Sequence, residues 1–216
     1  MSGGLRASAG RDDAPRRGRV PPFSIPPEED VGSVRTITQR LESGTLARSL
    51  ALAGAVAFFA VCTAVGAQVR VPLPFSPIPV TGQTLFVLLA GALLGRKLGP
   101  TSQLLYAGIA CVLPGAAAGP LHLTVGYIVG FGVAAYLVGT LVGESRSYPR
   151  VVGAMALGSL VIYLLGAAWL AGATGSISGA VLRGVLPFVP GDIVKLLLAA
   201  GIVTLGRRAS RPPSVR

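Results

Sequence analysis

Two charged residues, Asp192 and Lys195, lie close together in an otherwise apolar stretch of the sequence. On a helix, a spacing of three residues places both side chains on one face. A charge in a membrane interior costs roughly 2.5–3.5 kcal/mol, so it normally faces a cavity or a partner charge and marks function. A carboxylate accepts hydrogen bonds from N–H groups and an ammonium pairs with an acid, so the pair suits a ligand with an N–H end and a carboxylate end. The alternative is a mutually neutralised pair that only holds helices together.

The composition around this pair is that of a membrane protein. Of the 216 residues, 51% are hydrophobic and 12% are charged, and the mean hydropathy is +0.68. Soluble domains carry about 25% charged residues. The apolar residues form long blocks without a polar–apolar alternation, which predicts transmembrane helices and not barrel strands. Six blocks are expected to be helices, at residues 46–67, 80–94, 98–113, 121–142, 151–173 and 185–205.

The distribution of basic residues predicts how these helices are oriented. The net charge is +11, and most arginines lie in the two tails and in the connectors at 95–97 and 143–150, whereas the other connectors hold only Arg70 and Arg183. Lysine and arginine accumulate on the cytoplasmic side of membrane proteins. The same distribution argues against nucleic-acid binding. We therefore expect an all-α, multi-pass protein of the cell membrane, a bundle of six transmembrane helices with cytoplasmic N and C termini and a proline-rich extracellular loop between the first two helices.

The ends of the chain differ in composition from its centre. Residues 1–44 are rich in arginine, proline, glycine and serine and lack the apolar core of about 7–15 residues that a signal peptide needs. They are predicted to form a disordered basic cytoplasmic tail. Residues 45–206 form the predicted six-helix substrate-binding domain in the lipid bilayer, and residues 207–216 form a second basic cytoplasmic tail.

Sequence motifs of common enzyme classes are missing. There is no G-x-x-x-x-G-K-[ST] phosphate-binding loop, no H-E-x-x-H and no G-x-S-x-G in the chain. The single histidine, His122, has no partner motif and is interpreted as a residue at the membrane interface. We therefore expect a protein that is not an enzyme and holds no cofactor or metal, and whose transport would draw energy from another subunit or an ion gradient.

Other polar and aromatic residues are expected at the outer level of the membrane, where the Asp192–Lys195 pair lies. Some follow the proline-rich loop or open the fourth helix, and two lie toward the outer end of the fifth helix, where an interfacial aromatic belt is an equally good interpretation. The candidate ligand contacts among them are Arg70, Gln83, Thr124, Tyr127, Tyr163 and Trp169. A further pair of small residues, Ala60 and Ala64, gives the first helix a smooth face, which suits either packing within the bundle or a partner subunit.

Residues 71–91, VPLPFSPIPVTGQTLFVLLAG, resemble the first loop and second helix of the BioY family, the biotin-specific S components of energy-coupling-factor transporters. The segments GYxxGF at 126–131, IYLLG at 162–166 and PGDxxK at 190–195 follow in the family's order. The resemblance covers about residues 45–206. It departs at 123–127, where the chain reads LTVGY and the family usually has a Pro-Thr-Gly-Gly-Tyr order.

The resemblance implies capture of biotin outside the cell and its delivery inward with an ATP-driven module, made of a transmembrane coupling subunit and ATP-binding subunits. It implies that Asp192 and Lys195 contact the ligand and that Tyr127 lines its pocket. It further implies that Phe75 and the neighbouring prolines form a lid, and that the Ala60 and Ala64 face docks on the coupling subunit. Two alternatives stay open, namely an S component for a different vitamin and a non-transport scaffold within the membrane.

Overall fold

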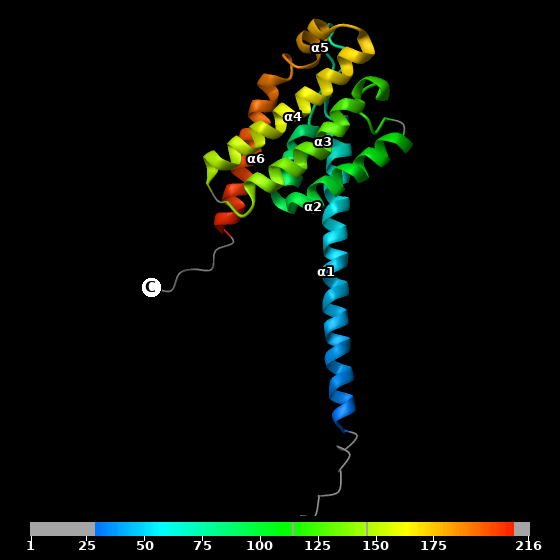
Figure 1. The fold of residues 1–216 in the computed structure, drawn as a ribbon, viewed down its shortest axis with the longest axis vertical. Coiled ribbons are helices and arrows are strands. Elements are labelled where there is room, and N and C mark those ends of the chain that lie inside the picture. Colours follow the sequence, from blue (N-terminus) through cyan, green and yellow to red (C-terminus); the bar gives the residue numbers. More distant parts are fainter. Residues whose placement is uncertain (1–28, 114, 146, 210–216) are drawn as a thin grey trace, which may run out of the picture. The chain divides into compact units, whose positions relative to one another are not determined.

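The computed structural model describes residues 29–113, 115–145 and 147–209, and it places side chains from Gly44 onward within these ranges. The chain separates into two units, Met1–Gly44 and Thr45–Arg216, and the second unit holds the helical bundle. The fold is all-α, apart from one short hairpin (Figure 1). Its elements are α1 (Glu29–Gln68), β1 (Arg70–Val71), β2 (Val80–Thr81), α2 (Gln83–Val112), α3 (Leu121–Val142), α4 (Tyr148–Thr174), α5 (Ile177–Gly184) and α6 (Val189–Ala209).

The two ends of the described chain differ from the predicted boundaries. α1 begins at Glu29 and not near residue 46. The predicted disordered tail covers residues 1–44, and its residues 1–28 lie outside the described residues. α6 begins at Val189 and not at 185, because Val185 still caps α5 through a hydrogen bond from its N–H to the carbonyl of Val181. α6 extends to Ala209, so part of the predicted C-terminal tail is helical.

α2 is a pair of antiparallel helices joined by a tight turn, as the two separate blocks predicted. Gly95 breaks the helix with φ 78° and ψ −174°, a conformation that favours glycine. A straight helix would separate Gln83 from Tyr106 by about 35 Å, yet the Gln83 amide donates a hydrogen bond to the Tyr106 hydroxyl. A methyl group at Gly99 would lie 3.0 Å from the Cα of Gly91 in the other half. The segment therefore doubles back at Gly95.

The short helix α5 was not predicted, since its sequence was interpreted as a connector. Ser176 caps its start, because the Ser176 hydroxyl accepts a hydrogen bond of 3.0 Å from the N–H of Gly179. Several of its apolar side chains face outward, with Ile177 77% and Leu182 59% exposed. α5 packs against α4 and leads into the turn before α6 (Figure 1).

The proline-rich loop is tied at its base by the hairpin of β1 and β2. The two strands are antiparallel, with Arg70 opposite Thr81 and Val71 opposite Val80. The hydroxyl of Ser76 accepts a hydrogen bond from the N–H of Ile78 within the loop. Residues 72–79 therefore form a closed loop with fixed ends, in place of the fully extended connector that proline alone would favour.

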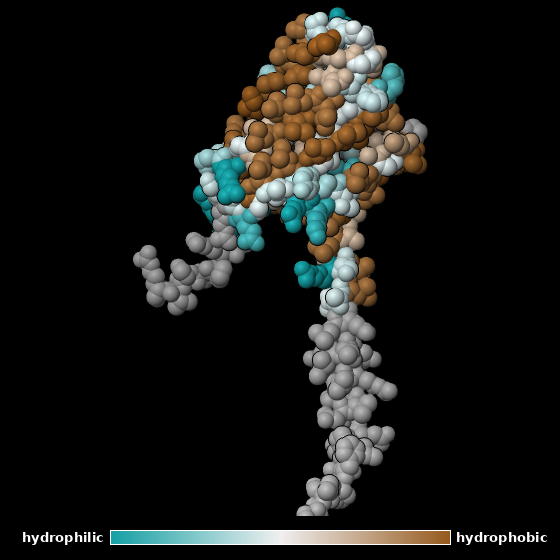
Figure 2. All heavy atoms as spheres, viewed as in Figure 1, coloured by the Kyte–Doolittle hydropathy of each residue, from teal (hydrophilic) through white to brown (hydrophobic). Residues whose placement is uncertain are grey.

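Glycines allow the helices of the bundle to approach closely, and apolar side chains cover its outside. A methyl group at Gly91 of α2 would lie 2.7 Å from the carbonyl oxygen of Ala135 in α3, and one at Gly130 of α3 would lie 3.0 Å from the Cα of Ile162 in α4. Figure 2 shows apolar residues covering most of the visible face of the bundle. Among the described residues, four helical segments are long and apolar enough to cross a membrane: Gly44–Gln68, α3, α4 and α6.

Candidate ligand-binding site

A cavity lies among the loop, α2, α3, α4 and the start of α6. Its wall combines an apolar and aromatic majority with a few polar groups, which is typical of small-molecule sites. The polar lining residues are Thr81, Gln83, Thr84, Thr124, Asp192 and Lys195. The aromatic ones are Tyr106, Tyr127, Phe131, Tyr163 and Phe188, and the rest are Ile78, Pro79, Ala118, Ile128 and Ile162.

Asp192 and Lys195 form an ion pair on this wall, with 2.5 Å between the Lys195 Nζ and the Asp192 Oδ1. Both residues lie in the first two turns of α6, and their side chains are 7% and 18% exposed. The Asp192 Oδ1 also accepts a hydrogen bond of 2.8 Å from Thr84, and its Oδ2 accepts one of 2.6 Å from Tyr163. A carboxylate in the first turn is further stabilised by the positive end of the helix dipole.

Lys195 reaches from α6 to the base of the proline-rich loop. Its Nζ donates to the carbonyl oxygen of Thr81 and, at 3.3 Å, to the hydroxyl of Thr84. Together with Asp192, these acceptors use the three N–H donors of the ammonium group. The pair is therefore satisfied within the protein, and a ligand that binds either charge must replace some of these contacts.

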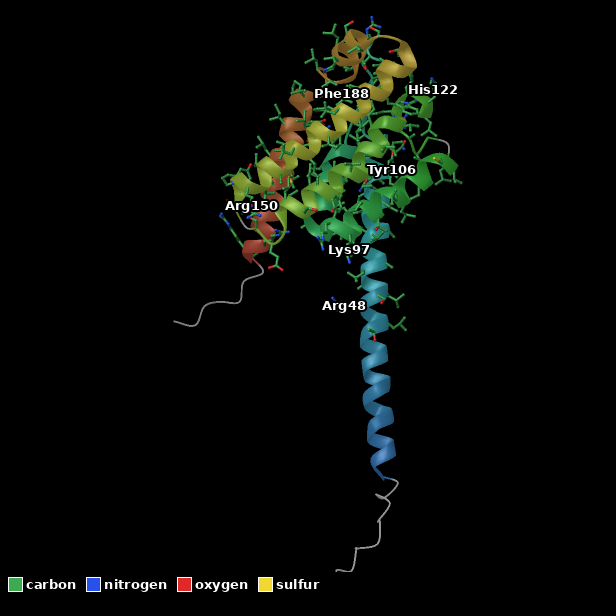
Figure 3. The ribbon with its side chains drawn as sticks, in the orientation of Figure 1. Arg48, Lys97, Tyr106, His122, Arg150 and Phe188 are labelled. Carbon is green, nitrogen blue, oxygen red and sulfur yellow. The ribbon has the colours of Figure 1, made fainter. Side chains whose placement is uncertain are left out.

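A second polar network crosses the cavity wall from the hairpin to the connector before α3. The Thr81 hydroxyl donates to the Gln83 Oε1 at 3.2 Å, and the Gln83 amide donates to the hydroxyl of Tyr106. The Tyr106 hydroxyl in turn donates to the carbonyl oxygen of Ala116 at 3.4 Å. Tyr106 is fully buried inside the bundle (Figure 3). This network fixes the two halves of α2 beside the cavity.

Tyr127 is held by close packing and by a hydrogen bond to α5. Its hydroxyl donates to the carbonyl oxygen of Gly184 at 2.7 Å. Its ring lies against Gly166 of α4, where an added methyl group would be 2.2 Å from the ring. The glycine is therefore required for the position of Tyr127 on the cavity wall.

The structure brings together six of the nine residues predicted to contact a ligand. These six line the cavity: Gln83, Thr124, Tyr127, Tyr163, Asp192 and Lys195. Thr124 is held there by its hydroxyl, which donates to the carbonyl oxygen of Pro120 at 3.3 Å. The ligand contacts themselves remain predictions for all six.

The other three predicted contacts lie away from the cavity lining. The Arg70 guanidinium donates to the side-chain oxygen of Gln68 at 2.7 Å, and Phe75 is 57% exposed on the loop. Trp169 is 46% exposed and donates from its indole Nε1 to the carbonyl oxygen of His122 at 2.8 Å. His122 lies in the first turn of α3, at the same end of the bundle as Phe188, whereas Lys97 and Arg150 lie toward the other end (Figure 3).

The two candidate docking residues of α1 differ in accessibility. Ala60 is fully buried, and Ala64 is partly buried against the same core cluster. The burial of Ala60 fits the alternative that was left open, namely packing within the bundle. A docking role for the two residues stays a prediction.

Several cavity residues were not among the predicted ligand contacts. They include Tyr106, Phe131, Ile162 and Phe188, which stand in long apolar blocks of the sequence. Nothing in such a block shows which side faces a cavity, because every face of a membrane helix is apolar. Thr81 and Thr84 flank Gln83 directly after the proline-rich loop and were expected at the same outer level as the ion pair, but they were not among the predicted contacts.

Comparison with known proteins assigns the chain to a family. Residues 38–212 match the model of the BioY family. This chain belongs to the BioY family. It is accordingly a multi-pass membrane protein, in agreement with its apolar helices.

Individual relatives carry related names. The chain is 40% identical to the probable biotin transporter BioY of Pyrococcus horikoshii, over 67% of this chain and 88% of the relative. It is 32% identical to the biotin transporter BioY of Thermotoga maritima, over 66% of this chain and 87% of the relative. The fold also resembles the crystal structure of the S-component for biotin from an ECF-type ABC transporter. That likeness has a TM-score of 0.68 at 23% identity and covers 74% of this chain and 93% of the other.

Proposed function

We propose that this chain is the biotin-binding S component of an energy-coupling-factor transporter, a transport subunit and not an enzyme. The observation that carries the proposal is the Asp192–Lys195 pair on the wall of a largely apolar and aromatic cavity. Membership of the BioY family and the names of its relatives support biotin as the ligand. In the cell, the protein captures the vitamin outside and delivers it inward with ATP-driven partners.

The chemistry of biotin matches the two kinds of groups on the wall. The ureido N–H groups of the vitamin suit the carboxylate of Asp192, and its carboxylate suits the ammonium of Lys195. The aromatic residues Tyr127, Phe131 and Phe188 provide an apolar surface for the rings and the aliphatic chain. The cavity therefore offers one suitable contact for each part of the ligand.

Binding requires a change in the ion pair. The two polar ends of biotin are separated by its rings and its valerate chain, whereas the charged atoms of Asp192 and Lys195 lie 2.5 Å apart. We therefore expect Lys195 to release Asp192 and to turn toward the ligand carboxylate. The ligand carboxylate would thus replace the contact of Lys195 with Asp192 as well as its contacts with Thr81 and Thr84.

The proposed topology has six crossings, because each half of α2 makes one. Arg96 and Lys97 follow the turn at Gly95, and Arg207 and Arg208 end α6, so basic residues mark the cytoplasmic side. The cavity and the proline-rich loop then face the outside, and both termini face the cytoplasm. This arrangement suits a subunit that takes its ligand from the outside.

The proposed partners are a transmembrane coupling subunit and a pair of ATP-binding subunits. The similar crystal structure is named as a component of an ECF-type ABC transporter, and the present chain has no phosphate-binding loop of its own. Ala64 of α1 is partly exposed and remains the better candidate of the two alanines for a contact with the coupling subunit.

A calorimetric titration of the purified protein with biotin tests this proposal. Wild type should bind tightly, and Asp192→Ala and Lys195→Ala should each bind roughly ten- to 150-fold more weakly, because each loses a hydrogen bond to a charged group. Biotin amide, which lacks the carboxylate, should lose affinity for wild type but little for the Lys195 variant. Failure of the folded protein to bind micromolar biotin would contradict the proposal, and binding of a different vitamin would assign the site to that vitamin.

A further inference from the structure

The hydroxyl of Ser76 connects the proline-rich loop to the end of α5. Its oxygen lies 2.6 Å from the carbonyl oxygen of Arg183 and 2.7 Å from that of Ile78, and it accepts a hydrogen bond of 3.2 Å from the N–H of Ile78. The contact with Arg183 joins residues 107 positions apart in the sequence. The loop is therefore attached at its middle as well as at its base.

This attachment bears directly on the cavity. Ile78 and Pro79 line the cavity, and Ile78 is only 6% exposed. Ser76 lies two residues before Ile78, so a change in the contacts of its hydroxyl would move this part of the cavity wall. Ser76 is thus placed to act on binding without touching the ligand itself.

A serine hydroxyl has one proton, so it donates to one carbonyl at a time. When the loop lies against α5, the proton can bond Arg183; when the loop leaves, it can bond Ile78 within the loop. No donor is left without a partner in either state. Opening the loop instead takes this donor away from the carbonyl of Arg183, so the hydroxyl favours the closed loop by about one hydrogen bond to that carbonyl.

The same end of α5 is also connected to the cavity wall. The carbonyl of Arg183 accepts from Ser76, and the next carbonyl, that of Gly184, accepts from Tyr127 at 2.7 Å. A methyl group at Gly184 would lie 2.6 Å from the Tyr127 hydroxyl, so the contact is close. The carbonyl groups of the consecutive residues Arg183 and Gly184 thus connect the loop and Tyr127 to the same end of α5.

We propose that Ser76 and the end of α5 form a latch that holds the loop closed over the cavity, and that Tyr127 couples this latch to the bound ligand. Ser76 acts as a positioning residue, because it holds the loop and does not touch the ligand. Only the identity of the ligand as biotin rests on the proposed function. Movement of Tyr127 against a ligand shifts the α5 carbonyls and so changes the strength of the latch.

The rate of biotin dissociation tests the latch. Ser76→Ala should release biotin roughly two- to tenfold faster, the effect of one neutral hydrogen bond, with an unchanged melting temperature. Ser76→Thr retains the hydroxyl and should restore the slow rate. Ser178→Ala on exposed α5 is the matched control and should behave as wild type, since Ser178 pairs only loosely with Ser176 at 3.4 Å. A Ser76→Ala protein that releases biotin at the wild-type rate would overturn the latch.

Hydrogen exchange over residues 72–79 tests the latch without any ligand. Ser76→Ala should exchange faster in this loop than wild type and Ser178→Ala, whichever vitamin the protein binds. Equal exchange in all three proteins would overturn the proposal. Absence of biotin binding by wild type, combined with faster exchange in Ser76→Ala, would contradict the proposed function and leave the latch supported.

A double-mutant cycle tests the coupling. Tyr127→Phe removes the hydrogen bond to Gly184, and Ser76→Ala removes the one to Arg183. If both act through the end of α5, the double variant should release biotin less rapidly than the product of the two single effects. Effects that simply multiply would show that Tyr127 acts on the ligand alone and would overturn the coupling.

Discussion

The two ends of the bundle use charge in different ways. At the end with the cavity, Asp192 and Lys195 satisfy each other and are surrounded by side-chain hydroxyl groups beside empty space. At the other end, the guanidinium of Arg207 donates to the backbone carbonyls of Ala92 and Ser145, each at 2.7 Å. The first arrangement can exchange its partners for a ligand, whereas the second is bound to the backbone itself.

Arg207 provides hydrogen bonds for backbone carbonyls at the ends of other helices. Ala92 lies in the last turn before the break of α2 at Gly95, where helix carbonyls lack a partner within the helix. Arg150 acts similarly, because its Nε donates to the carbonyl of Leu141 near the end of α3 at 3.2 Å. Charge at the cavity end thus lies where a ligand could reach it, whereas charge at the other end holds helix ends together.

Replacing the ion pair with uncharged side chains should have the largest effect on binding. The double variant Asp192→Asn with Lys195→Met leaves no unpaired buried charge, so its stability should stay close to that of wild type. Biotin affinity should fall more than 100-fold, because two charged contacts are lost. Calorimetry and thermal unfolding measure the two quantities. Retained affinity in the double variant would show that the pair is only structural.

Removing the charge at the opposite end should have the reverse outcome. Arg207→Ala should lower the free energy of unfolding by about 1.5–3 kcal/mol, through lost charged hydrogen bonds to Ala92 and Ser145. Biotin affinity of the folded protein should stay within about twofold of wild type. Arg208→Ala, on an exposed neighbour, serves as the control. A selective loss of biotin binding in Arg207→Ala would break the contrast between the two ends.

Close packing around Tyr127 provides a prediction of intermediate size. Gly166→Ala places a methyl group 2.2 Å from the Tyr127 ring and should cost about 1–3 kcal/mol of stability and weaken binding. Gly172→Ala, in the same helix, meets no atom within 4 Å and should be neutral. Thermal unfolding and biotin titration of both variants provide the measurement. Equal behaviour of the two would contradict the packing described for α3 and α4.

The smallest effect is expected at Tyr163. Tyr163→Phe removes the hydrogen bond of 2.6 Å to the second oxygen of Asp192 and leaves the other contacts of that carboxylate in place. Affinity for biotin should fall about three- to tenfold, with little change in stability. Tyr136→Phe, at an exposed position of α3, should bind as wild type. Wild-type affinity in Tyr163→Phe would show that Asp192 needs no support from α4.

Much of the fold could be predicted from the sequence, because long apolar blocks must span the membrane, and the glycine, proline and charged residues between them mark where helices end. Gly95 with the basic residues after it marks the turn within α2, and no membrane helix would carry that sequence in its middle. The helix α5 escaped prediction because it is short and surrounded by small residues, which are typical of connectors. Its stability comes from the cap at Ser176 and from packing on α4, and a sequence pattern does not reveal the packing.

The site was predictable where a charge had to be buried and less so elsewhere. Asp192 and Lys195 stand out because placing a charge in a membrane costs free energy, so such residues are rare and usually have a function. Tyr106 gave no such signal, since its place on the cavity wall depends on how α2 doubles back. Trp169 shares α4 with the cavity residues Ile162 and Tyr163, but a helix directs its side chains to different sides, and the Arg70 guanidinium is held by the side-chain oxygen of Gln68. Their predicted ligand contacts remain to be tested.

The most direct test is a crystal structure of the protein with biotin bound. We expect biotin in the cavity among α2, α3, α4 and α6, with its ureido group at Asp192 and its carboxylate at Lys195, which has left the carbonyl of Thr81. Biotin bound elsewhere, or in the cavity with the Asp192–Lys195 contact intact and neither residue touching the ligand, would contradict this expectation.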